Sequence, residues 1–195
     1  MEANRPVEKH PLGFFLPENT RLLMLGSFPP KRERWSMEFY YPNFTNDMWR
    51  IFGLAFFGER DYFLMPGGKP FDREKIIAFL REKGIGLGDT AEAVIRLKDN
   101  ASDAFLQIVE PVDLRGVLAK IPQCEAIVTT GQKATDTLLT LIEAEEPKIG
   151  GYSAFEYDGR RMRFYRMPSS SRAYPKPLPE KAAMYRRMFE ELGMV

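Results

Sequence analysis

The sequence contains one cysteine, one histidine and no long apolar run, and each scarcity excludes a class of protein. Cys124 alone cannot build a disulfide framework, a cysteine zinc site or an iron–sulfur cluster. A single thiol suits a reducing compartment, so we expect a cytoplasmic protein. No apolar run approaches the ~20 residues of a membrane helix. The charged, proline-containing residues 1–11 do not resemble a signal peptide.

The single histidine, His10, lies in an N-terminal segment (residues 1–19) that we expect to be loosely attached. We therefore expect a mechanism without a histidine base, and neither a metal nor a cofactor. The length of 195 residues and the hydrophobic content of 44% suit one domain, residues 1–195, and we expect a monomer.

The net charge of +1 hides an uneven distribution. Residues 159–187 contain nine Lys or Arg side chains against Glu180 alone. Such a segment is either an electrostatic footprint for a polyanion or a solvated basic face that acidic helices balance elsewhere.

Short apolar runs at residues 21–26 and 126–131 have the pattern of buried strands. Helices are predicted from residue 48, from Asp72, over 132–143 and over 179–192. Strands that alternate with helices predict an α/β/α three-layer sandwich around a mostly parallel sheet. Asp158-Gly159 between alternating segments adds a β-hairpin in the C-terminal half.

Carboxyl ends of parallel strands meet at one edge of a sheet, where ligands bind. The loops 26–46, 167–177 and the one after Asp89 are expected at that edge. In the second of these, Ser169, Ser170 and Ser171 follow Pro168. Their hydroxyl and N–H groups suit a phosphodiester, although an ordinary serine-rich turn has the same composition.

Four segments, in this order, resemble the motifs of the uracil-DNA glycosylase superfamily: Leu25-Gly26-Ser27-Phe28-Pro29, Tyr40-Tyr41-Pro42, Asn46-Asp47-Met48-Trp49-Arg50 and Met167-Pro168-Ser169-Ser170-Ser171-Arg172. The first segments, with Gly86-Leu87-Gly88-Asp89, are most similar to the hypoxanthine-DNA (deoxyinosine) glycosylase branch. The last is similar to that of thymine and mismatch-specific uracil glycosylases. The resemblance spans residues 22–193.

The resemblance implies a DNA repair enzyme that hydrolyses the N-glycosidic bond of a deaminated base, hypoxanthine or uracil, flipped out of DNA. No lysine matches a Schiff-base position, so the enzyme would be monofunctional. Gly26, Ser27 and Phe28 would line the base pocket, and Tyr41 would stack on the base unless it is merely packed in its loop.

The same resemblance assigns the DNA contacts. The three serines, Arg172 and Lys176 would hold phosphates. Arg172 or Tyr174 would fill the gap that the extruded nucleotide leaves, and the residues do not decide between them.

Two positions depart from the family pattern. Phe28 stands where many relatives have Asn or Asp to handle the water, and Pro30 replaces a glycine. Asn46 matches the asparagine that looks catalytic in the hypoxanthine branch, so the resemblance makes it the first candidate for catalysis, with a helix N-cap as its alternative role. Asp89 is the second candidate, with a turn aspartate as the alternative.

Two other functions fit the same residues. The chain is either a nucleic-acid-binding module that has lost catalysis, consistent with Phe28 and Pro30, or a hydrolase of free nucleosides or nucleotides. Salt-sensitive binding that ignores the lesion would indicate the former, and activity on free deoxyinosine the latter.

Overall fold

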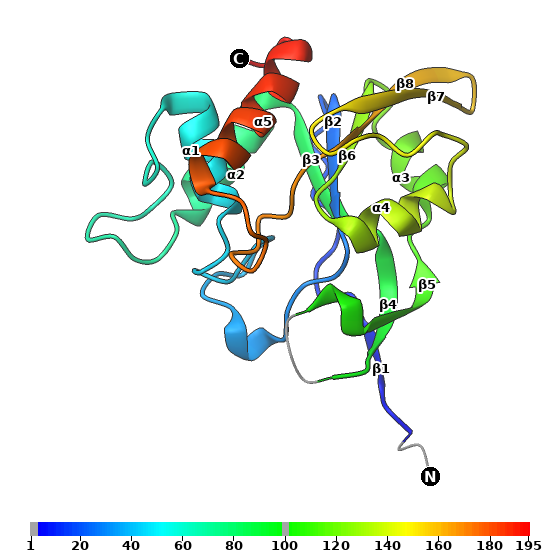
Figure 1. Cartoon of the computed structure of the whole chain (residues 1–195), viewed down its shortest axis with the longest axis horizontal. Coiled ribbons are helices and arrows are strands. Elements are labelled where there is room, and N and C mark those ends of the chain that lie inside the picture. The colour runs from blue at the N-terminus through cyan, green and yellow to red at the C-terminus, as the bar shows by residue number, and fades with distance from the viewer. Residues whose placement is uncertain (1–3, 99–101) are drawn as a thin grey trace.

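The computed structural model describes residues 4–98 and 102–195, which form two β-sheets and the helices around them (Figure 1). The larger sheet has the strand order β3-β2-β6-β8-β7. Its strands are β2 (Leu22–Gly26), β3 (Ile85–Asp89), β6 (Ala126–Thr129), β7 (Tyr152–Tyr157) and β8 (Arg160–Arg166). Strands β3, β2, β6 and β8 pair in parallel, and β7 pairs antiparallel with β8. The predicted parallel sheet and hairpin are confirmed.

Helices cover both faces of this sheet (Figure 1). Leu22 and Met24 of β2 pack in the core with helices α1 (Met48–Phe57), α2 (Arg73–Lys83) and α5 (Leu178–Glu191). Leu23 and Leu25 point the other way, into the core of α3 (Leu114–Ala119) and α4 (Gln132–Leu139). Because alternate residues of one buried strand feed two separate cores, the domain has the predicted three layers.

Local chemistry fixes several boundaries. Asp72 caps α2 by accepting a hydrogen bond from the Lys75 N–H at 3.1 Å. Asp158 and Gly159 have φ of 48° and 78°, the left-handed backbone that a tight hairpin turn requires. Helix α4 ends at Leu139, earlier than the predicted residue 143.

A second, antiparallel sheet was not predicted. It has the order β1-β4-β5, with β1 (Val7–Lys9), β4 (Ala91–Arg96) and β5 (Leu106–Pro111). Two single 3-10 turns, η1 (Arg32–Arg34) and η2 (Asp103–Phe105), complete the described elements. No helix in the described ranges is long and apolar enough to cross a membrane.

The N-terminal segment is tied to both sheets, which differs from the expected loose attachment of residues 1–19. Val7–Lys9 pairs with β4, and Phe15 forms a β-bridge with Leu87. Phe14 fills the space beside Gly88, where a Cβ would lie 1.9 Å from its ring. Small residues in β3 thus make room for the incoming chain.

Candidate functional site

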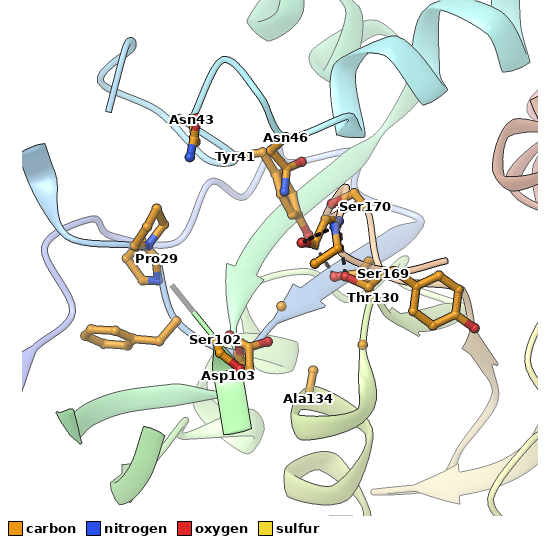
Figure 2. A pocket seen from close by; sticks show the side chains of 18 of the residues that line it. Pro29, Tyr41, Asn43, Asn46, Ser102, Asp103, Thr130, Ala134, Ser169 and Ser170 are labelled. Atoms are coloured by element: carbon orange, nitrogen blue, oxygen red, sulfur yellow. Dashed lines mark hydrogen bonds between the residues drawn. The ribbon is translucent and has the colours of Figure 1, made fainter. Parts of the chain in front are cut away.

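A cavity of about 650 Å³ opens at the carboxyl edge of the large sheet (Figure 2). Gly26 ends β2 and Asp89 ends β3, while Thr130 follows β6 and Ser169 follows β8. The three loops predicted to share this edge all contribute to the lining. Parallel pairing brings these strand ends together, although they are far apart in the sequence.

The floor of the cavity is a set of polar atoms gathered around Gly26. A Cβ at that position would lie 2.6 Å from Asp89 Oδ1, 3.6 Å from Tyr41 Oη and 3.7 Å from Thr130 Oγ1. Tyr41 and Thr130 are themselves joined by a hydroxyl–hydroxyl hydrogen bond of 3.0 Å. Position 26 is therefore a glycine because Asp89 Oδ1 occupies the space that a Cβ would need, while Tyr41 Oη and Thr130 Oγ1 lie at ordinary contact distance.

Tyr41 is held rigidly beside this floor. Its backbone has φ of 51°, a left-handed conformation that is unusual for a non-glycine residue. Its ring meets Trp49 edge to face at 5.9 Å. Burial raises the pKa of the Tyr41 hydroxyl, against the opposing effect of the hydrogen bond with Thr130. The hydroxyl thus stays protonated and can donate.

Asp89 contacts the single histidine of the chain. Asp89 Oδ2 lies 2.6 Å from His10 Nε2, and the two side chains are 8% and 7% exposed. Burial lowers the pKa of His10, but the hydrogen bond to Asp89 and its negative charge outweigh burial, so that the pKa is raised. The prediction that His10 lies in a loose segment is wrong, because β1 delivers it to the floor of the site.

Phe28 closes the wall next to this pair. Its ring packs edge to face on His10 at 5.3 Å and lies with Ala91, Val94 and Leu106 in the core of the small sheet. Phe28 and Ser27 both line the cavity, as predicted for a binding wall.

The side chain of Asn46 lies at the start of α1 and at the edge of the cavity. Its Oδ1 accepts a hydrogen bond from the Met48 N–H at 3.0 Å, at the start of α1. Its amide nitrogen points toward the cavity, which Asn46 lines (Figure 2). The helix thereby fixes which end of the amide faces the site.

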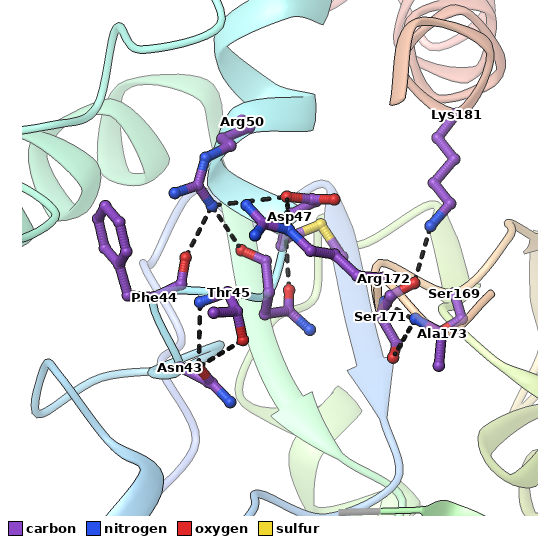
Figure 3. A network of polar contacts seen from close by, with 12 residues as sticks. Asn43, Phe44, Thr45, Asp47, Arg50, Ser169, Ser171, Arg172, Ala173 and Lys181 are labelled. Carbon is purple, nitrogen blue, oxygen red and sulfur yellow. Dashed lines mark hydrogen bonds and ion pairs between the residues drawn. The ribbon is translucent and has the colours of Figure 1, made fainter. Parts of the chain in front are cut away.

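Neighbouring elements engage three carbonyl groups of the serine loop, and Figure 3 shows that of Ser171 with Lys181. The carbonyls of Pro168, Ser170 and Ser171 accept hydrogen bonds from Tyr185 Oη, the Asp47 N–H and Lys181 Nζ at 2.9, 3.1 and 2.9 Å. Within the loop, the Ser171 N–H donates to Ser169 Oγ at 3.1 Å. The loop is therefore an ordered serine turn, held by hydrogen bonds within it and to α1 and α5.

The basic residues of the segment 159–187 serve different purposes. Arg172 lines the cavity, as do Tyr174 and the three serines. Lys181 is buried under the serine loop, and Arg160 donates to the carbonyls of Leu118 and Ile121. Lys176 is not part of the cavity lining and lies 3.8 Å from Glu180. The segment is thus not a uniform basic face.

Several lining residues were not predicted: Arg34, Asn43, Arg96, Asp103 and Thr130. Thr130 directly follows a buried strand, a position that could have indicated it. Arg96 comes from the unpredicted β4, where its Nη2 donates to the Pro29 carbonyl at 2.7 Å.

No protein-family model and no curated protein matches this chain significantly. A solved structure does match: the solution NMR structure of a candidate uracil-DNA glycosylase from Methanosarcina acetivorans, at 26% identity and a TM-score of 0.65. The match covers 96% of this chain and 99% of the other. The two proteins share one fold. The likeness supports the resemblance to the uracil-DNA glycosylase superfamily that the motifs indicate.

No group of three or more His, Cys, Asp or Glu side chains arranged to hold a metal ion occurs in residues 4–98 and 102–195.

Proposed function

We propose that this protein is a monofunctional DNA glycosylase that acts, as a monomer, on a deaminated base everted from DNA, with hypoxanthine as the first candidate and uracil as the second. The observation that carries the proposal is the convergence of the Asn46 loop and the serine loop on one cavity. Its volume, about 650 Å³, lies in the range of small-ligand pockets. The structural similarity to a candidate uracil-DNA glycosylase supports the same reaction class.

The base would lie against Tyr41, with its polar edge on the floor. Tyr41 and Thr130 supply hydroxyl groups there, and Asp89 supplies a carboxylate. Because the floor lies at the ends of buried strands, its atoms are fixed before the base arrives. Such preorganisation avoids an entropic cost on binding.

The chemical step separates a base that becomes negative from a sugar that becomes positive. Asp89 is an acidic group on the floor and the second catalytic candidate, either to orient the attacking water or to read the base. The Asn46 amide would donate to that water or to the leaving base, since its oxygen is already engaged by the helix.

The DNA backbone would cross the serine loop. The loop offers the hydroxyl groups of Ser169 and Ser171, since Ser170 is buried, and Arg172 is half-exposed although it pairs with Asp47. Arg172 and Tyr174 both line the cavity, so either is a candidate to fill the gap that the flipped nucleotide leaves in the base stack.

The test is an excision assay on duplexes with a single deoxyinosine or deoxyuridine, followed by alkaline cleavage of abasic sites. Asn46→Ala should reduce excision by about 10²–10³ while Asn19→Ala, an exposed control, should not. Absence of product from every deaminated base at enzyme excess overturns the proposal. Lesion-independent binding would then indicate a binding module, and cleavage of free deoxyinosine a nucleoside hydrolase.

A further inference from the structure

His10 contacts Asp89 from outside the cavity lining, and the family motifs do not account for this pair. The backbone N–H of His10 donates to the Glu92 carbonyl at 2.8 Å, which extends the pairing of β1 with β4. The imidazole packs against the rings of Phe28 and Tyr40, with centroids at 5.3 and 6.0 Å. These two contacts help to hold the imidazole beside Asp89.

Both ring nitrogens of His10 lie beside oxygen acceptors. Nε2 is 2.6 Å from Asp89 Oδ2, and Nδ1 is 2.6 Å from the Leu12 carbonyl. The doubly protonated imidazolium donates to both. The Leu12 N–H lies 3.1 Å from Nδ1 and serves the neutral form, which still donates from Nε2. In either form, Asp89 Oδ2 accepts a hydrogen bond from His10 Nε2.

This arrangement fixes what Asp89 presents to the cavity. Oδ2 is engaged by His10, and Oδ1 lies over Gly26 beside Tyr41 and Thr130. An oxygen of an ionised carboxylate accepts hydrogen bonds and donates none. Asp89 Oδ1 is therefore a fixed hydrogen-bond acceptor on the floor.

We infer that His10 is a positioning residue that holds Asp89 as an oriented acceptor, and that this acceptor selects bases with an N–H on the ring nitrogen that faces the floor. The inference rests on the proposed glycosylase function and narrows its substrate class. Hypoxanthine carries a hydrogen on N1 and uracil on N3, whereas their parents adenine and cytosine have bare nitrogens there. The contact reads the hydrogen that deamination adds.

A bare ring nitrogen placed against Asp89 would bring two acceptors together in a buried site. Leaving buried polar groups unpaired is the type of penalty by which enzymes reject analogues most strongly. Guanine also carries N1–H, so this contact separates each deaminated base from its parent and does not by itself reject guanine.

The first experiment needs no activity. Because His10 is the only histidine, untagged protein gives one set of imidazole NMR signals, which can be titrated directly. The groups facing the ring are Asp89 from β3, Glu92 from β4, and Tyr40 and Phe28 from the loop 26–46. Asp89→Asn should lower the midpoint of this titration, and Glu92→Gln should lower it less. An unchanged midpoint in Asp89→Asn overturns the pairing.

The second experiment measures excision across pH on duplexes with hypoxanthine, adenine, uracil or cytosine at one site. Asp89→Asn, whose amide can donate, should reduce the preference for hypoxanthine over adenine at least about ten-fold. His10→Phe, which cannot donate, should lose excision. His10→Gln should recover part of it and flatten the pH profile above pH 6.5, because the pKa of His10 is raised from that ordinary value. Lys9→Ala, an exposed neighbour on β1, should match wild type.

The outcomes separate the two proposals. A wild type that excises no deaminated base refutes the glycosylase function and the selectivity with it, while the NMR titration still judges the pair. A wild type that excises, together with folded His10→Phe and His10→Gln variants of unchanged rate and pH profile, refutes the inference alone.

Discussion

Asp47 and Arg172 join the two loops of the cavity: Arg172 Nε donates to Asp47 Oδ1 at 3.1 Å (Figure 3). The Asp47 N–H also donates to the Ser170 carbonyl at 3.1 Å. Arg50, which is 3% exposed, lies 3.5 Å from the same Oδ1 and donates to the carbonyls of Phe44 and Asn46. The Asp47 carboxylate thus joins the loop that contains Asn46 to the serine loop.

Removing this carboxylate should destabilise the protein. Asp47→Ala leaves the buried Arg50 without its counter-charge, and the free energy of unfolding should fall by about 1–3 kcal/mol. Urea denaturation measures the loss. Glu145→Gln changes the net charge equally at an exposed position and should stay within about 0.5 kcal/mol of wild type. Equal stability of the two variants would contradict a bridging role for Asp47.

Arg172 should contribute to DNA binding through charge. Arg172→Ala should weaken binding to lesion and undamaged duplexes alike by about ten-fold, and reduce the salt slope of the binding constant by roughly one. Fluorescence anisotropy at several salt concentrations gives both values. Arg187→Ala removes an equal charge from an exposed side chain on α5 and is the control. An identical salt slope in both variants would argue against a phosphate contact at Arg172.

Gly26 should tolerate no side chain. The Cβ in Gly26→Ala would lie 2.6 Å from Asp89 Oδ1, and His10 prevents the carboxylate from rotating away. We expect a stability loss of about 1–3 kcal/mol and a strong loss of excision. Gly13→Ala meets nothing within 4 Å and should behave as wild type in thermal unfolding and in the assay. A fully active Gly26→Ala would show that Asp89 can move freely.

The hydroxyls of Tyr41 and Thr130 should be energetically coupled. Tyr41→Phe and Thr130→Val each break the 3.0 Å hydrogen bond, so the double variant should be less destabilised than the sum of the singles, by about 0.5–1.5 kcal/mol. A double-mutant cycle in urea tests this. Strict additivity would mean that the two hydroxyls do not interact in solution.

The stability of the protein should depend on pH through His10. The folded-state pKa is raised above the ordinary 6.5, so the folded protein binds this proton more tightly than the unfolded chain. The resulting stabilisation is fully present below pH 6.5 and is lost as pH rises through the folded pKa. Unfolding free energies of wild type and His10→Gln should therefore converge toward higher pH. A constant difference across this range would contradict the raised pKa.

The large sheet could be predicted from the sequence because apolar strands such as residues 21–26 are continuous and Asp158-Gly159 specifies its turn locally. The position of the cavity could be predicted from strand polarity, because parallel strands place Asp89 and the serine loop at the same edge of the sheet. His10 could not be placed in this way. Its position depends on β1 pairing with β4, and that strand of three residues carries too little pattern to be recognised. Lys176 lies outside the cavity lining, so its phosphate contact stays a prediction that rests on sequence proximity to the serine loop.

The contact between His10 and Asp89 also spans the two sheets, because the imidazole follows a strand of the small sheet and the carboxylate ends a strand of the large one. This contact therefore depends on the distance between the two sheets, and a separation of the sheets would break it. The titration of one imidazole is therefore a gauge of how tightly the two halves of the domain are docked.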